Sequence, residues 1–525
     1  MASDQGVGNG DERGGRRLSG VDSFFLGVEA PSMPMHVGLA LVLEPGGQSA
    51  AGLAADIGRR LSTVPDLRAT LAGVPLGLQR PRLAPHGEVD VSAHVRTCRL
   101  PPPGGTGELE ALVAAEMARP LDRRRPLWEV VVVDGLSGGR VAVVAKVHHA
   151  LVDGMAGIET MAALFGPTAS AGHPDDGTHP DDGTHPEDGT HPEDGVGGTG
   201  DDGPPNGHRN GPSCLTAELA RLAETACGLP DQAGNVVRAM VRSMRSARDL
   251  SRANRDVAGE LPPSPFRAPR TSLNGAVSSQ RSVALGELPM AEVARVRRAY
   301  GGTVNDVLLT AVAGGLRSLF EARGEAPEAS VVAMVPVSVR STPEGPDEGY
   351  TLGNQLSAVL VSLPTGVEDP VARLRLVREE EAVAKRQHRV MGEDLLGVLA
   401  EAFVPAVTAP LARLATDLRA FDHLPPFANL VVSNVPGPTD GLSVGEARVV
   451  SAYPLGPVAH GIGVNVTVLS YGETLFVGVV GCRELAPDVA RLTAGIRADL
   501  GRLVAAAELR QRPVPWWHRD LVAGA

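Results

Sequence analysis

The feature that most restricts how this chain can fold is a run of four similar hexapeptides rich in His, Asp, Pro and Gly. The first is His173-Pro174-Asp175-Asp176-Gly177-Thr178, and the copies begin at His179, His185 and His191. These repeats carry too few apolar side chains to offset the conformational entropy that ordering would cost. The run therefore favours a solvated linker between two separately folded halves.

A length of 525 residues exceeds the usual size of one domain, and the composition divides the chain into five segments. We expect a disordered N-terminus (residues 1–17), a first folded half (18–165), a disordered linker (166–212), connecting helices (213–281) and a second folded half (282–525). The His and Asp residues of the linker also suggest loose metal binding. A spacing of six residues in a flexible chain fixes no coordination geometry, however, so no metal site is expected.

The formal charge of −12 is concentrated in the linker, where ten Asp or Glu residues occur between Gly172 and Gly203 without any Lys or Arg. About −2 is left for the rest of the chain. Neither an acidic nor a basic balance therefore indicates nucleic acid or another bulk partner. The four cysteines lack the spacing of a zinc site or a disulfide framework, which favours a reducing, cytoplasmic setting.

Contact with a membrane is expected to be peripheral at most. No run approaches the roughly 20 apolar residues that a spanning helix needs, and residues 1–17 are polar and rich in Gly. In residues 235–256, arginines recur at three- and four-residue steps beside apolar residues. This basic amphipathic helix could lie on anionic lipid or phosphate groups, or it could present a solvated face above a packed stripe.

Strand-like and helix-like apolar patterns alternate in both halves, which predicts mixed α/β structure. In the first half the patterns predict a strand at residues 37–43, a helix at 50–61, and strands at 128–133 and 140–147 around a glycine-rich connection. In the second half they predict strands at residues 331–337, 356–362 and 429–434, and a hairpin over 463–480.

The strand at residues 140–147 leads into His148-His149-Ala150-Leu151-Val152-Asp153-Gly154, the strongest candidate for chemistry. Histidine has a pKa of about 6.5, so a neutral imidazole at a strand end can accept the proton of an attacking alcohol as a general base. The structural alternative is a pair of satisfied core histidines, and the seven-residue pattern favours the functional interpretation. A zinc site of the HExxH type is excluded because adjacent histidines cannot share one helix face.

Asp153 has two interpretations that the sequence leaves open. It could accept a hydrogen bond from the imidazole and fix its tautomer, or it could pair with an arginine and hold the loop in shape. Gly154 follows it and would let backbone or ligand approach closely.

Asn305 also has two interpretations, because it precedes an apolar helix expected at residues 307–319. Its amide could stabilise an oxyanion by about 3 kcal/mol, or it could be the N-cap of the helix. Asp306 would then lie in the first turn, where a negative charge is favourable.

Pro126-Leu127-Trp128 is interpreted as the start of a strand with a buried indole. Residues 441–445 satisfy GxSxG, but a strand is expected after them instead of the helix that a nucleophile elbow requires.

The segment from His148 to Gly154 matches the HHxxxDG signature of the CoA-dependent acyltransferase superfamily, which includes chloramphenicol acetyltransferase and nonribosomal condensation domains. Within it, the chain resembles the bacterial wax ester synthases/diacylglycerol acyltransferases over nearly its whole length, except the repeat. The similar stretches are Leu18–Phe25, Met35–Gly38, Pro126–Trp128, Asn305–Val307, Met334–Arg340, Gly353–Gln355 and Ser433–Pro438.

This resemblance implies an α/β fold of two chloramphenicol-acetyltransferase-like mixed-sheet domains, with an active-site tunnel at their interface. Acyl-CoA would enter from one side as co-substrate, with no other cofactor, and diacylglycerol or a long-chain alcohol from the other. The resemblance also implies that His149 is the general base and that His148 supports it. Asp153 would then be architectural, with Arg340 as its expected salt-bridge partner.

The resemblance therefore predicts an acyl-CoA-dependent O-acyltransferase that makes triacylglycerol, wax esters or both. Its expected location is the cytoplasm, with the inner membrane or lipid inclusions as peripheral sites. One alternative is an acyltransferase of the same fold that acts on another alcohol, such as a polyketide diol. The other is a non-catalytic protein associated with lipid bodies, against which the intact His pair argues.

Overall fold

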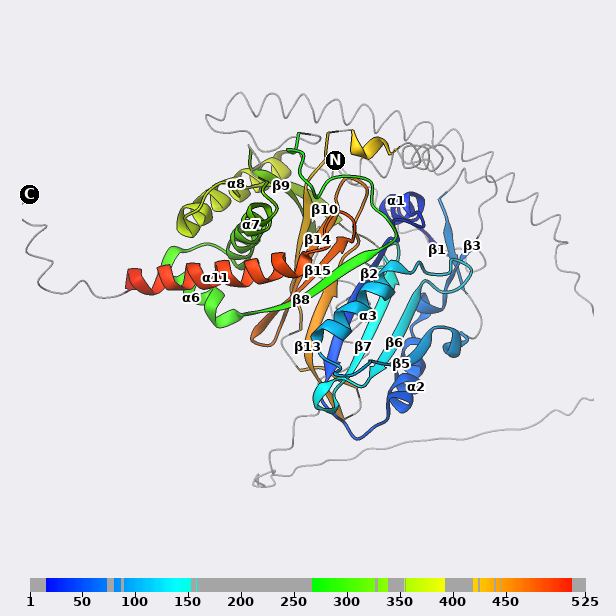
Figure 1. Cartoon of the computed structure of the whole chain (residues 1–525). Helices are drawn as coiled ribbons and strands as arrows, with labels where there is room; N and C mark the ends of the chain where they lie inside the picture. The colour runs from blue at the N-terminus through cyan, green and yellow to red at the C-terminus, as the bar shows by residue number, and fades with distance from the viewer. Residues whose placement is uncertain are drawn as a thin grey trace, which may run out of the picture.

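Two six-stranded sheets and one three-stranded sheet form the frame of the described part of the chain (Figure 1). The computed structural model describes residues 16–72, 80–85, 89–152, 157, 267–325, 329–338, 354, 356–391, 419–423, 425–438, 441–444 and 446–511. The predicted linker and the arginine-rich helix at 235–256 lie outside these residues, as do residues 213–266 of the predicted connecting helices. Residues 267–280 of that segment form turns and no helix, and a strand begins at Arg281, so the prediction of helices is wrong there. The predicted mixed α/β class is confirmed for both halves, since each six-stranded sheet contains parallel and antiparallel pairs and helices lie between its strands in sequence.

The first sheet has the strand order β12-β13-β2-β7-β6-β5, in which only β5 and β6 pair in parallel. Its strands are β2 (His36–Leu43), β5 (Val95–Arg99), β6 (Trp128–Asp134), β7 (Val141–His148), β12 (Ser443–Val444) and β13 (Ala447–Leu455). Helix α2 (Ala50–Leu61) follows β2, and α3 (Thr106–Ala118) follows β5. The predicted helix at 50–61 and the predicted pair of strands around the glycine-rich connection are both confirmed. The connection turns tightly at Gly135 and Gly138, both of which have positive φ.

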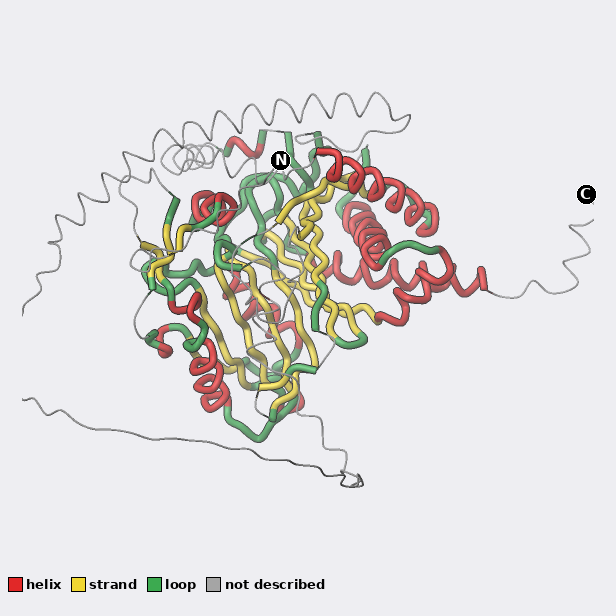
Figure 2. Tube along the Cα trace, turned by 180° about the vertical axis from the view of Figure 1, so that it is seen from behind, coloured by secondary structure: helices red, strands yellow, loops and turns green. Residues whose placement is uncertain are grey.

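The second sheet has the order β10-β9-β11-β14-β15-β8, and β11 runs parallel to both β9 and β14. Its strands are β8 (Arg281–Pro289), β9 (Val331–Ser338), β10 (Leu356–Leu363), β11 (Leu430–Val435), β14 (Val464–Tyr471) and β15 (Thr474–Cys482). The helices of this half are α6 (Met290–Tyr300), α7 (Val304–Ala322), α8 (Pro370–Met391) and α11 (Val489–Gln511), gathered on one side of the sheet (Figure 2). The predicted strands and the β14–β15 hairpin are confirmed.

A small sheet corrects the predicted N-terminal boundary. Strand β1 (Arg16–Arg17) pairs antiparallel with β4 (Arg82–Ala84), which in turn pairs with β3 (Thr70–Ala72). The predicted disorder of residues 1–17 is therefore wrong for Arg16 and Arg17. The reason is that β4, distant in sequence, supplies backbone partners that no local pattern reveals. Helix α1 (Gly20–Val28) follows this sheet.

Strand β13 crosses from the second half of the chain into the first sheet, where it pairs with β2. The sequence boundary at residue 282 therefore does not separate the two sheets. Ser443 lies in β12 and pairs with Arg448 of β13, so the GxSxG stretch has the predicted strand context and lacks that of a nucleophile elbow. Side chains of the two sheets meet beside β13, where Tyr453 Oη donates to Glu287 Oε1 at 2.6 Å.

Backbones of the two sheets approach closely at Gly478 of β15. A Cβ atom built there would lie 1.8 Å from the carbonyl oxygen of Pro454 in β13. A side chain of any size is therefore incompatible with the observed spacing unless the strands move apart.

The Gly478→Ala substitution tests this approach. We expect it to lower the free energy of unfolding by about 2 kcal/mol or more, because backbone cannot yield as a side chain can. The matched control is Gly501→Ala in α11, where a new Cβ meets nothing within 4 Å and should stabilise by up to about 1 kcal/mol. Urea unfolding of both variants measures the difference, and equal stability of the two would contradict the close approach.

Candidate active site

The backbone of the His pair is anchored at the end of β7 by two neighbouring segments. His148 lies opposite His36 of β2, and its N–H donates to the carbonyl oxygen of Leu127 at 2.9 Å. The N–H of His149 donates to the carbonyl oxygen of Met35 at 2.8 Å. Both imidazoles therefore start from fixed backbone positions, on the sheet where strands β2 and β7 run side by side (Figure 1).

The ring of His149 is held from two sides by groups of different origin. Phe25 of α1 stacks on it, with ring centroids 4.0 Å apart and an angle of 12° between the planes. Nδ1 of His149 lies 3.0 Å from Oδ1 of Asn354, a residue of the second half. The amide of Asn354 also donates to the carbonyl oxygen of His149 at 2.5 Å. The candidate base therefore sits where α1, the end of β7 and the residue ahead of β10 meet.

The ring of His148 has different surroundings, because it is fully buried. Its Nδ1 accepts a hydrogen bond from the N–H of Ala150 at 3.0 Å. An accepting Nδ1 places the ring proton of the neutral form on Nε2, which lies 3.4 Å from Oε1 of Glu29. His148 therefore ties the loop after β7 to the segment after α1, consistent with a supporting role.

Glu29 connects this arrangement to three neighbours. It accepts from the N–H of Met35 at 3.0 Å and from Nε of Arg123 at 2.8 Å, and it faces His148. Burial acts to raise the pKa of Glu29, but the His148 imidazole, the Arg123 guanidinium and the Met35 N–H together lower this pKa from 4.5 to about 2. Sequence reasoning missed Glu29, whose only signal was a carboxylate between the apolar helix α1 and the Met35-His36 stretch.

His36 and Lys146 are two further buried polar residues on β2 and β7. Burial, assisted by the charge of Lys146, lowers the pKa of His36 to about 3, so its ring stays neutral. Lys146 Nζ donates to the carbonyl oxygens of Glu116 and Arg119 at 3.2 and 2.7 Å. Both side chains hold the end of α3 against the sheet.

The Pro126-Leu127-Trp128 stretch has the predicted structure. Strand β6 begins at Trp128, whose indole is buried and donates to the carbonyl oxygen of Leu67 at 2.7 Å. His94 stacks on the indole with centroids 4.5 Å apart. Since Leu127 also accepts the hydrogen bond from the N–H of His148, this stretch positions the His pair through backbone.

Asn305 is not the N-cap of α7, and that interpretation is corrected. The cap is Thr303, two residues before Asn305, and it forms a capping box with Asp306. Asp306 does lie in the first turn, as predicted. Nδ2 of Asn305 donates to Oε1 of Glu381 on α8 at 2.8 Å. Burial and the neighbouring Asp306 carboxylate raise the pKa of Glu381, although Lys385 and Asn305 act in the opposite direction.

Three predicted residues, Asp153, Gly154 and Arg340, lie outside the described residues. Among the residues described, the structure instead brings together the His pair with Asp22, Phe25, Glu29 and Asn354. No group of three or more His, Cys, Asp or Glu in this described part could hold a metal ion. Nor does any described helix combine the length and apolar character needed to cross a membrane.

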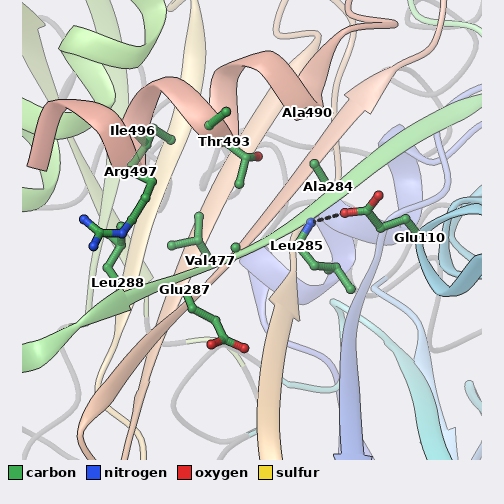
Figure 3. A pocket seen from close by; sticks show the side chains of 12 residues that line it. Glu110, Ala284, Leu285, Glu287, Leu288, Val477, Ala490, Thr493, Ile496 and Arg497 are labelled. Carbon is green, nitrogen blue, oxygen red and sulfur yellow. Dashed lines mark hydrogen bonds between the residues drawn. The ribbon is translucent and has the colours of Figure 1, made fainter. Parts of the chain in front are cut away.

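A cleft of about 290 Å³ lies elsewhere, between α11, β8 and α3 (Figure 3). Glu110 of α3 accepts a hydrogen bond from the N–H of Leu285 at its wall. Arg497 of α11 also lines it, but its guanidinium is paired with Glu292. The cleft contains neither histidine of the His pair, so the candidate site rests on the imidazoles and their partners.

Replacement of Glu29 by Gln tests the charge beside His148. The pKa of Glu29 in the folded state lies below its unfolded value, so its ionisation stabilises the fold fully above about pH 4.5 and progressively less as pH falls toward 2. The shift corresponds to roughly 3 kcal/mol. In urea unfolding from pH 3 to 7, Glu29→Gln should therefore lose most stability at neutral pH and approach the wild type in acid. Exposed Glu473→Gln is the control, and a pH-independent loss for Glu29→Gln would contradict the assignment.

Two family models match the chain: the wax ester synthase/diacylglycerol acyltransferase catalytic domain over residues 18–308, and the WS/DGAT C-terminal domain over residues 352–503. A Mycobacterium tuberculosis protein named as a diacylglycerol O-acyltransferase is 33% identical over 497 residues, 93% of this chain and 90% of the relative.

Two solved structures share the fold. The wax ester synthase/diacylglycerol acyltransferase from Marinobacter aquaeolei VT8 has a TM-score of 0.60 at 24% identity, covering 94% of this chain and 100% of that one. The first condensation domain of the calcium-dependent antibiotic synthetase has a TM-score of 0.53 at 14% identity, covering 96% and 99%. With its full-length match and its intact His pair, the chain belongs to the wax ester synthase/diacylglycerol acyltransferase family.

Proposed function

We propose that this protein transfers a long-chain acyl group from acyl-CoA to the hydroxyl of diacylglycerol, a long-chain alcohol, or both. The observation that carries the proposal is the placement of His149, whose ring is oriented by Asn354 and Phe25 at the end of β7. Membership of the family and the name of the mycobacterial relative support the same reaction class.

The reaction is a direct transfer with His149 as general base. Nε2 of the neutral imidazole takes the hydroxyl proton as the alcohol oxygen attacks the thioester carbonyl carbon. The tetrahedral intermediate then collapses, the carbon–sulfur bond breaks, and the CoA thiolate leaves. The imidazolium returns its proton to this sulfur, so ester and free CoA leave while the enzyme is regenerated. No metal or cofactor takes part besides the acyl-CoA co-substrate.

The other residues of the HHxxxDG stretch have supporting roles in this proposal. His148 holds the loop through Glu29, and Arg340 is proposed as the salt-bridge partner of Asp153, which would make Asp153 architectural. The substrates reach His149 through a tunnel between the two halves. The protein works in the cytoplasm or at the surface of the inner membrane or lipid inclusions, where its lipid acceptors gather, and has no nucleic-acid partner.

Asn305 is proposed as a stabiliser of the oxyanion, and its bond to Glu381 provides the test. An oxyanion donor contributes about 3 kcal/mol, equivalent to a loss of roughly 100-fold in kcat when it is removed. Asn305→Ala should show this loss in acyl-transfer assays, whereas Glu381→Gln should retain more activity because the Asn305 amide is still present. Equal losses in both variants would indicate that the Asn305–Glu381 contact serves structure alone.

The reaction itself is tested with purified protein, palmitoyl-CoA and either diacylglycerol or hexadecanol, by following the release of free thiol. Wild-type protein should release thiol only when an acceptor is present, and His149→Ala should lose at least about 100-fold of this rate. His423→Ala is the control, since His423 is an exposed histidine of the second half. Full activity of His149→Ala would refute the base, and no acceptor-dependent release by the wild type would favour a non-catalytic lipid-associated protein.

A further inference from the structure

We infer that Asp22 and Asn354 are positioning residues that fix the tautomer and the orientation of the His149 ring. Their effect on the ring is independent of the reaction, and only its kinetic consequence rests on the proposed function. Asp22 belongs to α1 and Asn354 lies ahead of β10, 332 positions further along the chain. The base is therefore complete only when both halves of the chain are in contact.

The hydrogen bonds of Asn354 determine which way its amide points. Nδ2 lies 2.7 Å from Oδ1 of Asp22 and 2.5 Å from the carbonyl oxygen of His149, and both partners are acceptors. The amide nitrogen must occupy this position, so the amide oxygen faces Nδ1 of His149 at 3.0 Å. An amide oxygen only accepts, which places the ring proton on Nδ1 and the lone pair on Nε2.

Asp22 is itself held rigidly and is completely buried. Oδ1 of Asp22 accepts from Nδ2 of Asn354, and it also accepts from the backbone N–H of Asn354 at 3.0 Å. Oδ2 accepts from the N–H of Ser19 at 3.0 Å, and Ser19 Oγ accepts from the N–H of Asp22 at 3.1 Å. The capping box of α1 thus orients the carboxylate that orients Asn354.

This chain of contacts also favours the charge that develops during catalysis. When Nε2 takes up a proton, the imidazolium presents its Nδ1–H to the oxygen end of the Asn354 amide. The carboxylate of Asp22 at the other end polarises this amide in the stabilising direction. Phe25, three residues after Asp22 on α1, stacks on the His149 ring and fixes the orientation of its plane. One short helix therefore supplies both the planar support and the buried negative charge.

NMR of protein labelled in histidine tests the inference without substrates. The resonances of His149 are those missing from His149→Gln, and their nitrogen shifts report which ring nitrogen carries the proton. In the wild type we expect the Nδ1–H form. In Asn354→Ala we expect a mixture of tautomers and a midpoint of ring titration lowered by about one pH unit. Asp22→Asn, which keeps the shape of the side chain, should lower the midpoint in the same direction.

Two control variants separate positioning from structure. Asn429 is also buried and its side chain forms three hydrogen bonds in the second half, so Asn429→Ala should cost similar stability without changing the titration of His149. Ser19→Ala removes the Ser19 Oγ bond of the α1 cap but keeps the Ser19 backbone N–H, which is the group that holds Oδ2 of Asp22, so it should likewise leave the titration unchanged.

A folded Asn354→Ala or Asp22→Asn protein with the wild-type tautomer and midpoint would overturn the inference. In kinetics, the acid limb of kcat/KM should move by the same amount as the NMR midpoint, with a rate loss of about tenfold or more. A wild type that shows the expected tautomer but no acceptor-dependent thiol release would refute the proposed function and leave the positioning role intact.

Discussion

The hydrogen bond between Asn354 and His149 is the contact on which the organisation of the site depends, because it joins the two halves of the chain at the proposed base. The first half supplies the histidine on β7 and the stacking ring of Phe25 on α1. The second half supplies the amide that assigns the ring proton to Nδ1. Neither half alone holds the His149 ring in this orientation, so both halves contribute residues to the proposed site.

Other contacts keep the halves in the register that this hydrogen bond needs. Strand β13 completes the first sheet with residues of the second half, and Gly478 allows its backbone to approach β15 closely. Arg281 of β8 donates to the carbonyl oxygen of Ser32 at 2.9 Å, next to the segment that Glu29 holds on His148. The loop between α1 and β2 therefore contacts the second half through Ser32 and His148 through Glu29.

Local sequence patterns predicted the helices and strands whose formation depends on neighbouring residues. The helix at Ala50–Leu61 and the β6–β7 pair follow from periodicity and from glycines in a tight connection, and the seven-residue His segment pointed to His149 as the candidate base. The sheet that β13 joins could not be predicted, because strand alternation carries no information on partners. Asp22 and Asn354 lay within stretches recognised by resemblance, but their pairing across 332 positions needed the fold. The sequence left Asn305 open between an oxyanion donor and a cap, although Thr303, with an acidic residue three positions later, carried the stronger capping signal.

Two titrations of the wild-type protein test whether neutral His149 removes the proton of the acceptor alcohol. One is the NMR titration of the His149 ring in the free enzyme, and the other is the pH dependence of kcat/KM for acceptor-dependent thiol release. Because kcat/KM reports ionisations of the free enzyme, a general base at His149 requires the acid limb of the kinetic profile to have the same midpoint as the titration of the ring. A rate that stays constant while His149 becomes protonated would contradict it.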